Sequence, residues 1–219
     1  QVKLDGSTYP NLHKQIELLK LTKEDLAVIK QLEPFAQQVV PNMVEKFYGA
    51  ISLSPELVDI IGSSARMDRL KGTLTKHLEA MFNCNIDSQY IEERQTIAHV
   101  HVKIGLQSKW YIASFQSLMT TFIDFISKIE MSNVDMAKAV DAFSKLINFE
   151  QQLVIEAYEK EEQRIRTESL DVKYRIVERI QHTAQELTHI SDQTNASLQE
   201  IASQSEEIAS NTKQGLNLV

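Results

Sequence analysis

The sequence of 219 residues contains a single cysteine, Cys84. It excludes an internal disulfide framework and any zinc site built from several cysteines. The net charge of −7 argues against nucleic acid as a partner, because phosphate binding needs a basic face. No apolar run approaches the roughly 18 residues that cross a bilayer, and no signal peptide opens the chain. We therefore expect an acidic, soluble, cytoplasmic protein with no membrane span.

Glycine and proline are also scarce, at six and four residues, and all four prolines precede residue 56. This scarcity disfavours a β architecture, which needs many turns. The rest of the sequence reads as long helices with short breaks, so the predicted fold class is all-α. Helices are expected from the Thr22–Asp25 capping box, from near Pro41, from Ser54-Pro55, over 65–82 and 88–105, from about Ser108 to Glu130, and from near Ser132.

The helix expected from Ser132 carries two apolar stripes instead of one. A helix with one wet side needs a single stripe, so the second stripe indicates contact with a partner subunit and predicts a helical homodimer. The alternative is a helix that lies at the centre of a monomer. One stripe holds Met136, Val140, Phe143 and Ile147, and the other holds Ala142, Leu146, Phe149 and Leu153.

Beyond roughly residue 160 the sequence changes character, to the charged stretch EKEEQRIRTES. Apolar residues then recur every seven positions, with Thr194 at one of them, which predicts a weak coiled-coil seam. We expect a first domain over residues 1–165 and a coiled-coil part over 166–219. Because the chain opens on Gln1 and the pattern still runs at Val219, we expect the natural protein to extend further. The apolar seam residues are Ile180, Leu187, Ile201 and Ile208.

Two histidines lie two positions apart in the stretch IAHVHVKIGL. Neighbours two apart on a helix point in nearly opposite directions, so the two rings cannot bind one metal together. His101 should face inward with Ile97 and Ile104, while His99 faces solvent. An inward histidine is more often a core residue than a ligand, and both readings stay open on this evidence alone.

Side chains on the neighbouring helices favour the ligand reading for His101. They combine an apolar interior with a few polar groups, as small-molecule pockets do. All-helical surroundings with one histidine fit heme better than zinc, which needs three or four protein ligands. No nucleophile–base pair, phosphate loop or carboxylate pair is present, so we do not expect an enzyme. The pocket candidates include Phe47, Tyr48, Leu70, Thr73, Leu74, His77, Trp110 and Tyr111.

Four separated segments resemble, in order and spacing, the sensor domain of globin-coupled sensors, and most closely the HemAT-type aerotaxis transducers. The resemblance covers roughly residues 8–165. It implies a globin fold that lacks the D helix, has an extra N-terminal helix, binds heme b and dimerises through its last two helices. The segments are FYGAI, DRLKGTLTKHLEAMF, IAHVHVKIGLQSKWYIASFQ and LINFEQQLVIEAY.

The resemblance also implies roles for individual residues. His101 would be the proximal heme ligand, and its other ring nitrogen should donate to a backbone carbonyl, with Ile97 the natural acceptor one turn back. Tyr48 would be the distal tyrosine, Thr73 the distal-helix threonine, and Tyr111 a proximal-side tyrosine implicated in signalling. Ser64 stands where the best-matched relative has a histidine. Phe47 and Leu70 would be apolar pocket lining. The helical faces add Leu74, His77, Ile97 and Ile104 to the expected pocket.

The stretch ASQSEEIAS approximates the adaptation-site pattern of a methyl-accepting signalling helix, with Glu206 and Glu207 as its methylation candidates. Gln199 and Glu200 form a poorer match. The sequence thus predicts a heme-based oxygen sensor that signals through its coiled coil to a chemotaxis kinase complex. CO and NO are further ligands that we expect its heme to bind. The alternatives are another output such as a nucleotide cyclase or kinase, a heme-free globin-like interaction module, and an oxygen-consuming heme enzyme.

Overall fold

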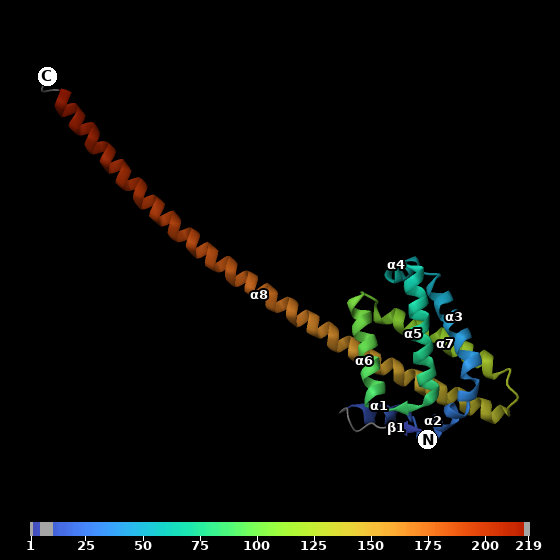
Figure 1. Ribbon diagram of the computed structural model, residues 1–219. Coiled ribbons are helices and arrows are strands. Elements are labelled where there is room, and N and C mark those ends of the chain that lie inside the picture. Colours follow the sequence, from blue (N-terminus) through green and yellow to red (C-terminus); the bar gives the residue numbers. More distant parts are fainter. Residues whose placement is uncertain (1, 5–10, 217–219) are drawn as a thin grey trace. The chain divides into compact units, whose positions relative to one another are not determined.

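The computed structural model describes residues 2–4 and 11–216, with side chains described as far as Lys213. The last part of the predicted coiled-coil pattern, residues 217–219, lies outside the described residues. The chain is almost entirely helical, which confirms the predicted all-α class (Figure 1). The elements are α1 (Leu12–Leu19), α2 (Lys23–Gln31), the 3-10 helix η1 (Glu33–Phe35), α3 (Ala36–Ile51), α4 (Pro55–Ile61), α5 (Ser64–Asn83), α6 (Ser88–Lys103), α7 (Ser108–Ile126) and α8 (Asn133–Leu216).

Several helices begin where a polar side chain satisfies the free N–H groups of the first turn. The Thr22 hydroxyl accepts from the Asp25 N–H at 3.1 Å while the Asp25 carboxylate accepts from the Thr22 N–H at 2.8 Å, which confirms the predicted capping box of α2. Asp87 caps α6 in the same way by accepting from the Tyr90 N–H at 3.1 Å. The Asp87 cap fixes the start of α6, the helix that carries His99 and His101.

Two helix limits differ from those expected. Helix α3 begins at Ala36, so Pro41 lies inside it and not near its first turn. The 3-10 turn η1 leads straight into α3, so the helix is already under way when Pro41 is reached. Helix α7 ends at Ile126, four residues before Glu130, because the Lys128 N–H turns back to the Phe125 carbonyl at 3.0 Å.

Both apolar stripes of α8 are covered within a single chain, fully except at Met136 and Val140, which are partly buried. Phe143, from one stripe, stacks on Phe122 of α7 with 3.8 Å between ring centroids and lies 6.0 Å from Phe82 of α5. Leu146 and Phe149, from the other stripe, have no exposed surface. The first part of α8 is therefore a central helix, and the two stripes no longer argue for a partner subunit.

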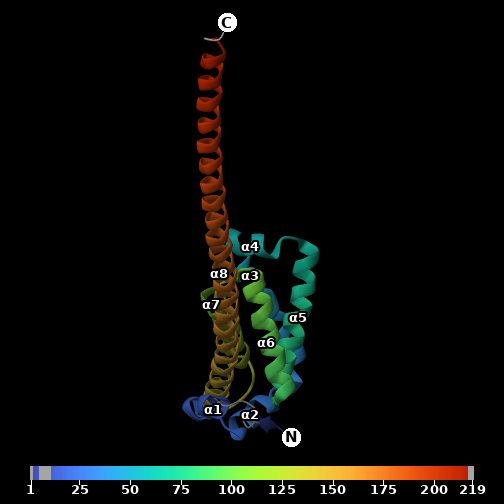
Figure 2. The ribbon, with the colours of Figure 1, turned by 90° about the vertical axis from the view of Figure 1, so that its left-hand side faces the viewer.

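Side chains of α1, α2, α5, α6 and α7 contact this segment of α8. Helix α3 packs on α5 and α7, and α6 lies beside the first part of α8 (Figure 2). The sequence did not predict one small feature, a parallel pairing of β1 (Lys3–Leu4) with β2 (Asn85–Ile86) just before α6. Within the described ranges, no helix combines the length and the apolar character needed to span a membrane.

The chain divides into two compact units, Gln1–Gln163 and Arg164–Val219. The first holds α1 to α7 and the start of α8, and the second is the remaining part of α8. Within the second unit the predicted seam residues are exposed by 58% to 67% of their surface, namely Ile180, Leu187, Ile201 and Ile208. Among the described residues of this unit, none packs over the apolar seam, which is therefore exposed.

Candidate functional site

The two histidines of α6 point in different directions, as the helical spacing predicts. His99 is 54% exposed and pairs with Glu161 of α8, with 3.2 Å between Nδ1 and Oε1. His101 is half-buried, and its Nδ1 atom is buried without a hydrogen-bond partner. Of the two rings, only that of His101 can serve an interior site.

The His101 ring is neutral and has a free nitrogen. Burial, reinforced by the nearby His77, lowers the pKa of His101 from 6.5 to about 4. The expected hydrogen bond from the ring to the Ile97 carbonyl is absent, since the buried Nδ1 atom of His101 has no partner. A neutral imidazole with an unpaired, buried nitrogen is suited to ligate a metal.

Tyr111, the second residue with an implied proximal role, lies next to His101. Their ring centroids are 5.3 Å apart, and Tyr111 in turn contacts Phe115 at 5.1 Å and Tyr158 of α8 at 6.2 Å. Burial and the negative charge of Glu150 raise the pKa of Tyr111 well above its ordinary value. A row of rings therefore connects α6, α7 and α8. The hydroxyl of Tyr111 within this row stays protonated.

The two distal candidates differ in how available their hydroxyl groups are. Tyr48 is buried, lies edge-on to Phe47 at 5.1 Å, and makes no hydrogen bond through its hydroxyl to any described residue. Burial raises the pKa of Tyr48 to about 12, so the hydroxyl keeps its proton. Thr73 is exposed, and its hydroxyl already donates to the Arg69 carbonyl at 3.1 Å. Tyr48 is the donor that remains free.

The expected apolar lining is only partly in place. Ile104 is 47% exposed, against the expectation that it faces inward with His101. The reason is that α6 ends at Lys103, after which Gly105 takes a left-handed conformation and turns the chain away. The other lining candidates are partly buried and pack against the core, namely Phe47, Leu70, Leu74 and Ile97.

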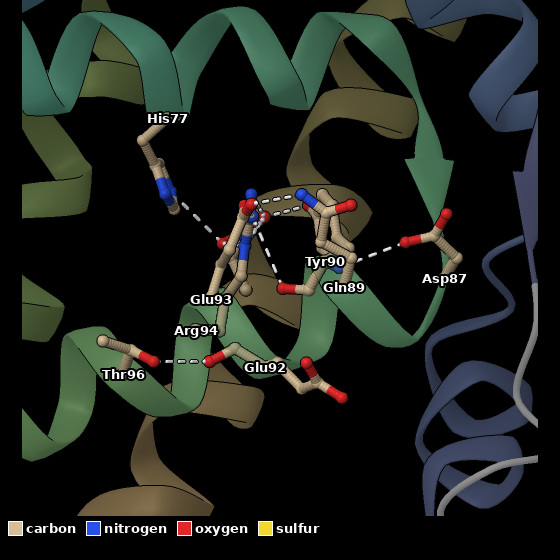
Figure 3. A network of polar contacts seen from close by, with 9 residues as sticks. His77, Asp87, Gln89, Tyr90, Glu92, Glu93, Arg94 and Thr96 are labelled. Carbon is tan, nitrogen blue, oxygen red and sulfur yellow. Dashed lines mark hydrogen bonds and ion pairs between the residues drawn. The ribbon is translucent and has the colours of Figure 1, made fainter.

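A buried ion pair, which the sequence analysis missed, joins α6 to α8. Arg94 and Glu150 have no exposed surface, and Arg94 donates from Nη2 to Oε1 at 2.8 Å and from Nε to Oε2 at 3.0 Å. The Tyr90 hydroxyl also donates to Oε1, and the Arg94 guanidinium lies 3.4 Å above the Tyr90 ring (Figure 3). The sequence contained one indication of this burial. Arg94 lies three and seven residues before Ile97 and His101, so helical spacing places it on the same inward face of α6.

His77, expected in the pocket, belongs to this same network. Its Nε2 lies 3.3 Å from Oε2 of Glu150, and its side chain is 11% exposed (Figure 3). Burial alone would raise the pKa of Glu150, but the Arg94 guanidinium and His77 outweigh it and hold that pKa well below the usual range. Glu150 is therefore a charged carboxylate that binds side chains from α5 and α6.

The remaining candidates are exposed residues. Ser64 is the first residue of α5 and is exposed. The four methylation candidates are exposed on α8 within the second unit, namely Gln199, Glu200, Glu206 and Glu207.

Comparison with known proteins places the first unit among globins. The Protoglobin family model matches residues 8–164. The "Heme-based aerotactic transducer HemAT" of Halobacterium salinarum is 21% identical over 145 residues, which cover 62% of this chain and 30% of that protein. The chain thus spans less than a third of the length of this curated relative.

Solved structures give the same fold. The globin domain of the Geobacter sulfurreducens globin-coupled sensor matches with a TM-score of 0.62 at 19% identity, covering 67% of this chain and 96% of that one. The globin domain of E. coli DosC, in a ferric form, matches with a TM-score of 0.60 at 15% identity, covering 66% and 99%. These matches confirm the predicted globin fold, and the length of α8 confirms the predicted long helix.

Proposed function

Because this chain belongs to the protoglobin family and has the globin domain of a globin-coupled sensor, we propose that it binds heme b through His101 and senses oxygen. The observation that carries the proposal is the His101 ring, which is neutral, turned inward and free at a buried nitrogen. The distant relative from H. salinarum, named as heme-based, supports the same cofactor.

The donor set of the chain fits heme better than a bare metal ion. Among the described residues, no group of three or more His, Cys, Asp or Glu side chains could hold a metal. In heme, the porphyrin supplies four ligands to the iron, so a single protein ligand is enough. His101 can be that ligand. When bound, heme supplies a ferrous iron that binds diatomic gases reversibly. The partly buried apolar residues Phe47, Leu70, Leu74 and Ile97 would contact its ring and exclude water.

Tyr48 is the residue proposed to favour oxygen over carbon monoxide. If heme is bound, dioxygen on it would carry partial negative charge, so a hydroxyl donor of the chain would stabilise it by roughly 1 kcal/mol or more in a dry pocket, while carbon monoxide would gain less. Tyr48 has a free, protonated hydroxyl, whereas the Thr73 hydroxyl is engaged within its own helix. We therefore assign Tyr48 the main role and Thr73 a secondary one.

The output is proposed to pass through α8 to a chemotaxis kinase complex. Residues 1–165 would form the sensor domain, and residues 166–219 a coiled-coil linker with the start of a methyl-accepting domain. Support comes from the uncovered seam of the second unit, which a second copy of the chain would cover in a homodimer. Thr194 weakens that seam, so two packings of the coiled coil could lie close in energy. Glu206 and Glu207 would then be adaptation sites.

The test is an absorption spectrum of the purified protein, reduced and then exposed to air, beside His101→Ala and a matched His99→Ala control. We expect a strong Soret band and a stable oxygenated spectrum in the wild type and in the control, and loss of both in His101→Ala. A wild-type protein that cannot take up added heme would refute the proposal, and the domain would then be a heme-free interaction module.

A further inference from the structure

The Arg94–Glu150 pair is fully buried, and its stability contribution alone does not explain its presence. Removing two charges from water costs several kcal/mol per ion, and replacing such a pair by apolar residues is often neutral or stabilising. Arg94 and Glu150 lie 56 residues apart in the sequence, on α6 and α8. Buried ionic groups of this kind can instead fix which of several similar packings two helices adopt.

The geometry of Glu150 is that of a junction. Its Oε1 atom accepts from Tyr90 and Arg94 of α6, and its Oε2 atom faces Nε2 of His77 on α5 at 3.3 Å and accepts from Arg94 (Figure 3). One carboxylate of α8 is therefore held by side chains from two other helices. A shift of α8 by one turn would leave the buried Arg94 with only the carboxylate of Glu93, on its own helix and 3.3 Å from Nη1, as a counter-ion.

The same face of α6 carries the proposed heme ligand. Arg94 and His101 are seven residues apart, which places them two turns and about 10 Å apart along the axis. At the His101 end, α6 meets α8 again through the row of rings that runs by way of Tyr111 to Tyr158. The two helices run in the same direction along this contact, because residue numbers increase together on both sides.

We propose that Glu150 is a positioning residue that fixes the axial register of α8 against α6. A displacement of His101 would then move α8 by way of the rings, because Arg94 and Glu150 prevent the two helices from sliding past each other. Without the pair, α6 would shift relative to α8 and the displacement would be lost. This inference rests on the proposed function, since it concerns how the ligand state of His101 reaches the output helix.

The test is hydrogen–deuterium exchange of the heme-loaded full chain, with and without oxygen. The peptides to follow are residues 97–103 of α6 and 151–163 of α8. The test variant is Arg94→Met/Glu150→Leu, which keeps the space filled with apolar groups. We expect the oxygen-dependent change in α6 to persist and that in α8 to shrink by about fivefold or more, the scale of a lost coupling.

Two further variants separate positioning from simple loosening. Glu150→Gln keeps the shape of the side chain but removes its charge. We expect the oxygen-dependent change in exchange of α8 to shrink in this variant, as it does in the double variant. Glu45→Gln removes an exposed ion pair with Lys71, in which the charged atoms are 2.8 Å apart between α3 and α5, and should leave both responses unchanged. A merely structural role would raise exchange equally in both gas states and leave the oxygen-dependent difference intact.

The outcomes are distinguishable from failure of the proposed function. A double variant and a Glu150→Gln variant whose α8 responds to oxygen as the wild type does would overturn the positioning role while heme sensing stands. A wild-type chain that binds no heme would overturn the sensing proposal, and the positioning role with it.

Discussion

The rings of His101 and Tyr111 lie 5.3 Å apart, centroid to centroid, at an interplanar angle of 53°. Tyr111 also lies 6.2 Å from Tyr158 of α8, so three helices meet through aromatic contacts. Because cores are densely packed, a tilt of the His101 ring must displace Tyr111. This contact gives the proposed sensor a direct mechanical path from its ligand to the helix of its output.

Replacing one member of the buried ion pair should destabilise the fold strongly. Glu150→Leu leaves the buried Arg94 charge with only the half-exposed Glu93 carboxylate, 3.3 Å from Nη1, as a counter-ion, and should cost about 3–5 kcal/mol. Arg94→Met/Glu150→Leu should recover most of that loss, because no charge remains buried. Urea unfolding of the two variants measures the difference. A single variant within about 1 kcal/mol of the wild type would show that water reaches Arg94.

Acid should weaken the fold through Glu150. Its pKa is held well below the ordinary value of 4.5, since Arg94 and His77 outweigh burial. A carboxylate with a lowered pKa stabilises the folded state at neutral pH. This stabilisation is lost as the pH falls below the ordinary value of 4.5 toward the lowered pKa of the folded state. The gap in unfolding free energy between wild type and Glu150→Gln should therefore narrow between pH 7 and pH 3. A gap that stays constant over that range would contradict the assignment.

Loss of the Tyr48 hydroxyl should speed the release of oxygen. Tyr48→Phe keeps the ring and removes one hydrogen bond, so the dissociation rate should rise about fivefold to tenfold, or roughly 1–1.4 kcal/mol. Carbon monoxide release should change little, and Thr73→Val should have the smaller effect on oxygen. Stopped-flow displacement of oxygen measures the rates. An equal effect on both gases would mean that Tyr48 acts by its shape.

A charge in the seam of the second unit should weaken the proposed dimer. Leu187→Asp places a carboxylate at a core position of the coiled coil, while Gln185→Asp adds the same charge two residues away, off the seam. Sedimentation of the full chain should show a shift toward monomer for the first variant only. The same oligomeric state in both variants would place the dimer contact elsewhere.

Much of this fold follows from local sequence signals. The capping box at Thr22 and Asp25 and the Pro55 start of α4 act within one turn of a helix, so they can be predicted without knowledge of the rest of the chain. The opposite orientations of His99 and His101 follow from the 100° step between helical residues. These features are predictable because each depends on neighbours in the sequence.

The features that the sequence did not reveal depend on distant partners. The match of Arg94 to Glu150 becomes visible only when α6 and α8 are packed together. The same is true of the two apolar stripes on α8. Helices α5 and α7 cover Phe143 of one stripe, and Leu146 and Phe149 of the other are buried within the chain, so a partner subunit is not needed there. Ile104 was misplaced for a local reason, because α6 ends one residue before it.

The most direct test of the central claim is chemical rescue of a His101→Gly variant. Glycine removes the ring and leaves space in which free imidazole can bind, so the variant should lose heme or hold it weakly, and added imidazole should restore a histidine-like absorption spectrum. The matched His99→Gly variant should bind heme without help. If His101→Gly binds heme with an unchanged spectrum and does not respond to imidazole, His101 is not the ligand, and the account of this site is wrong.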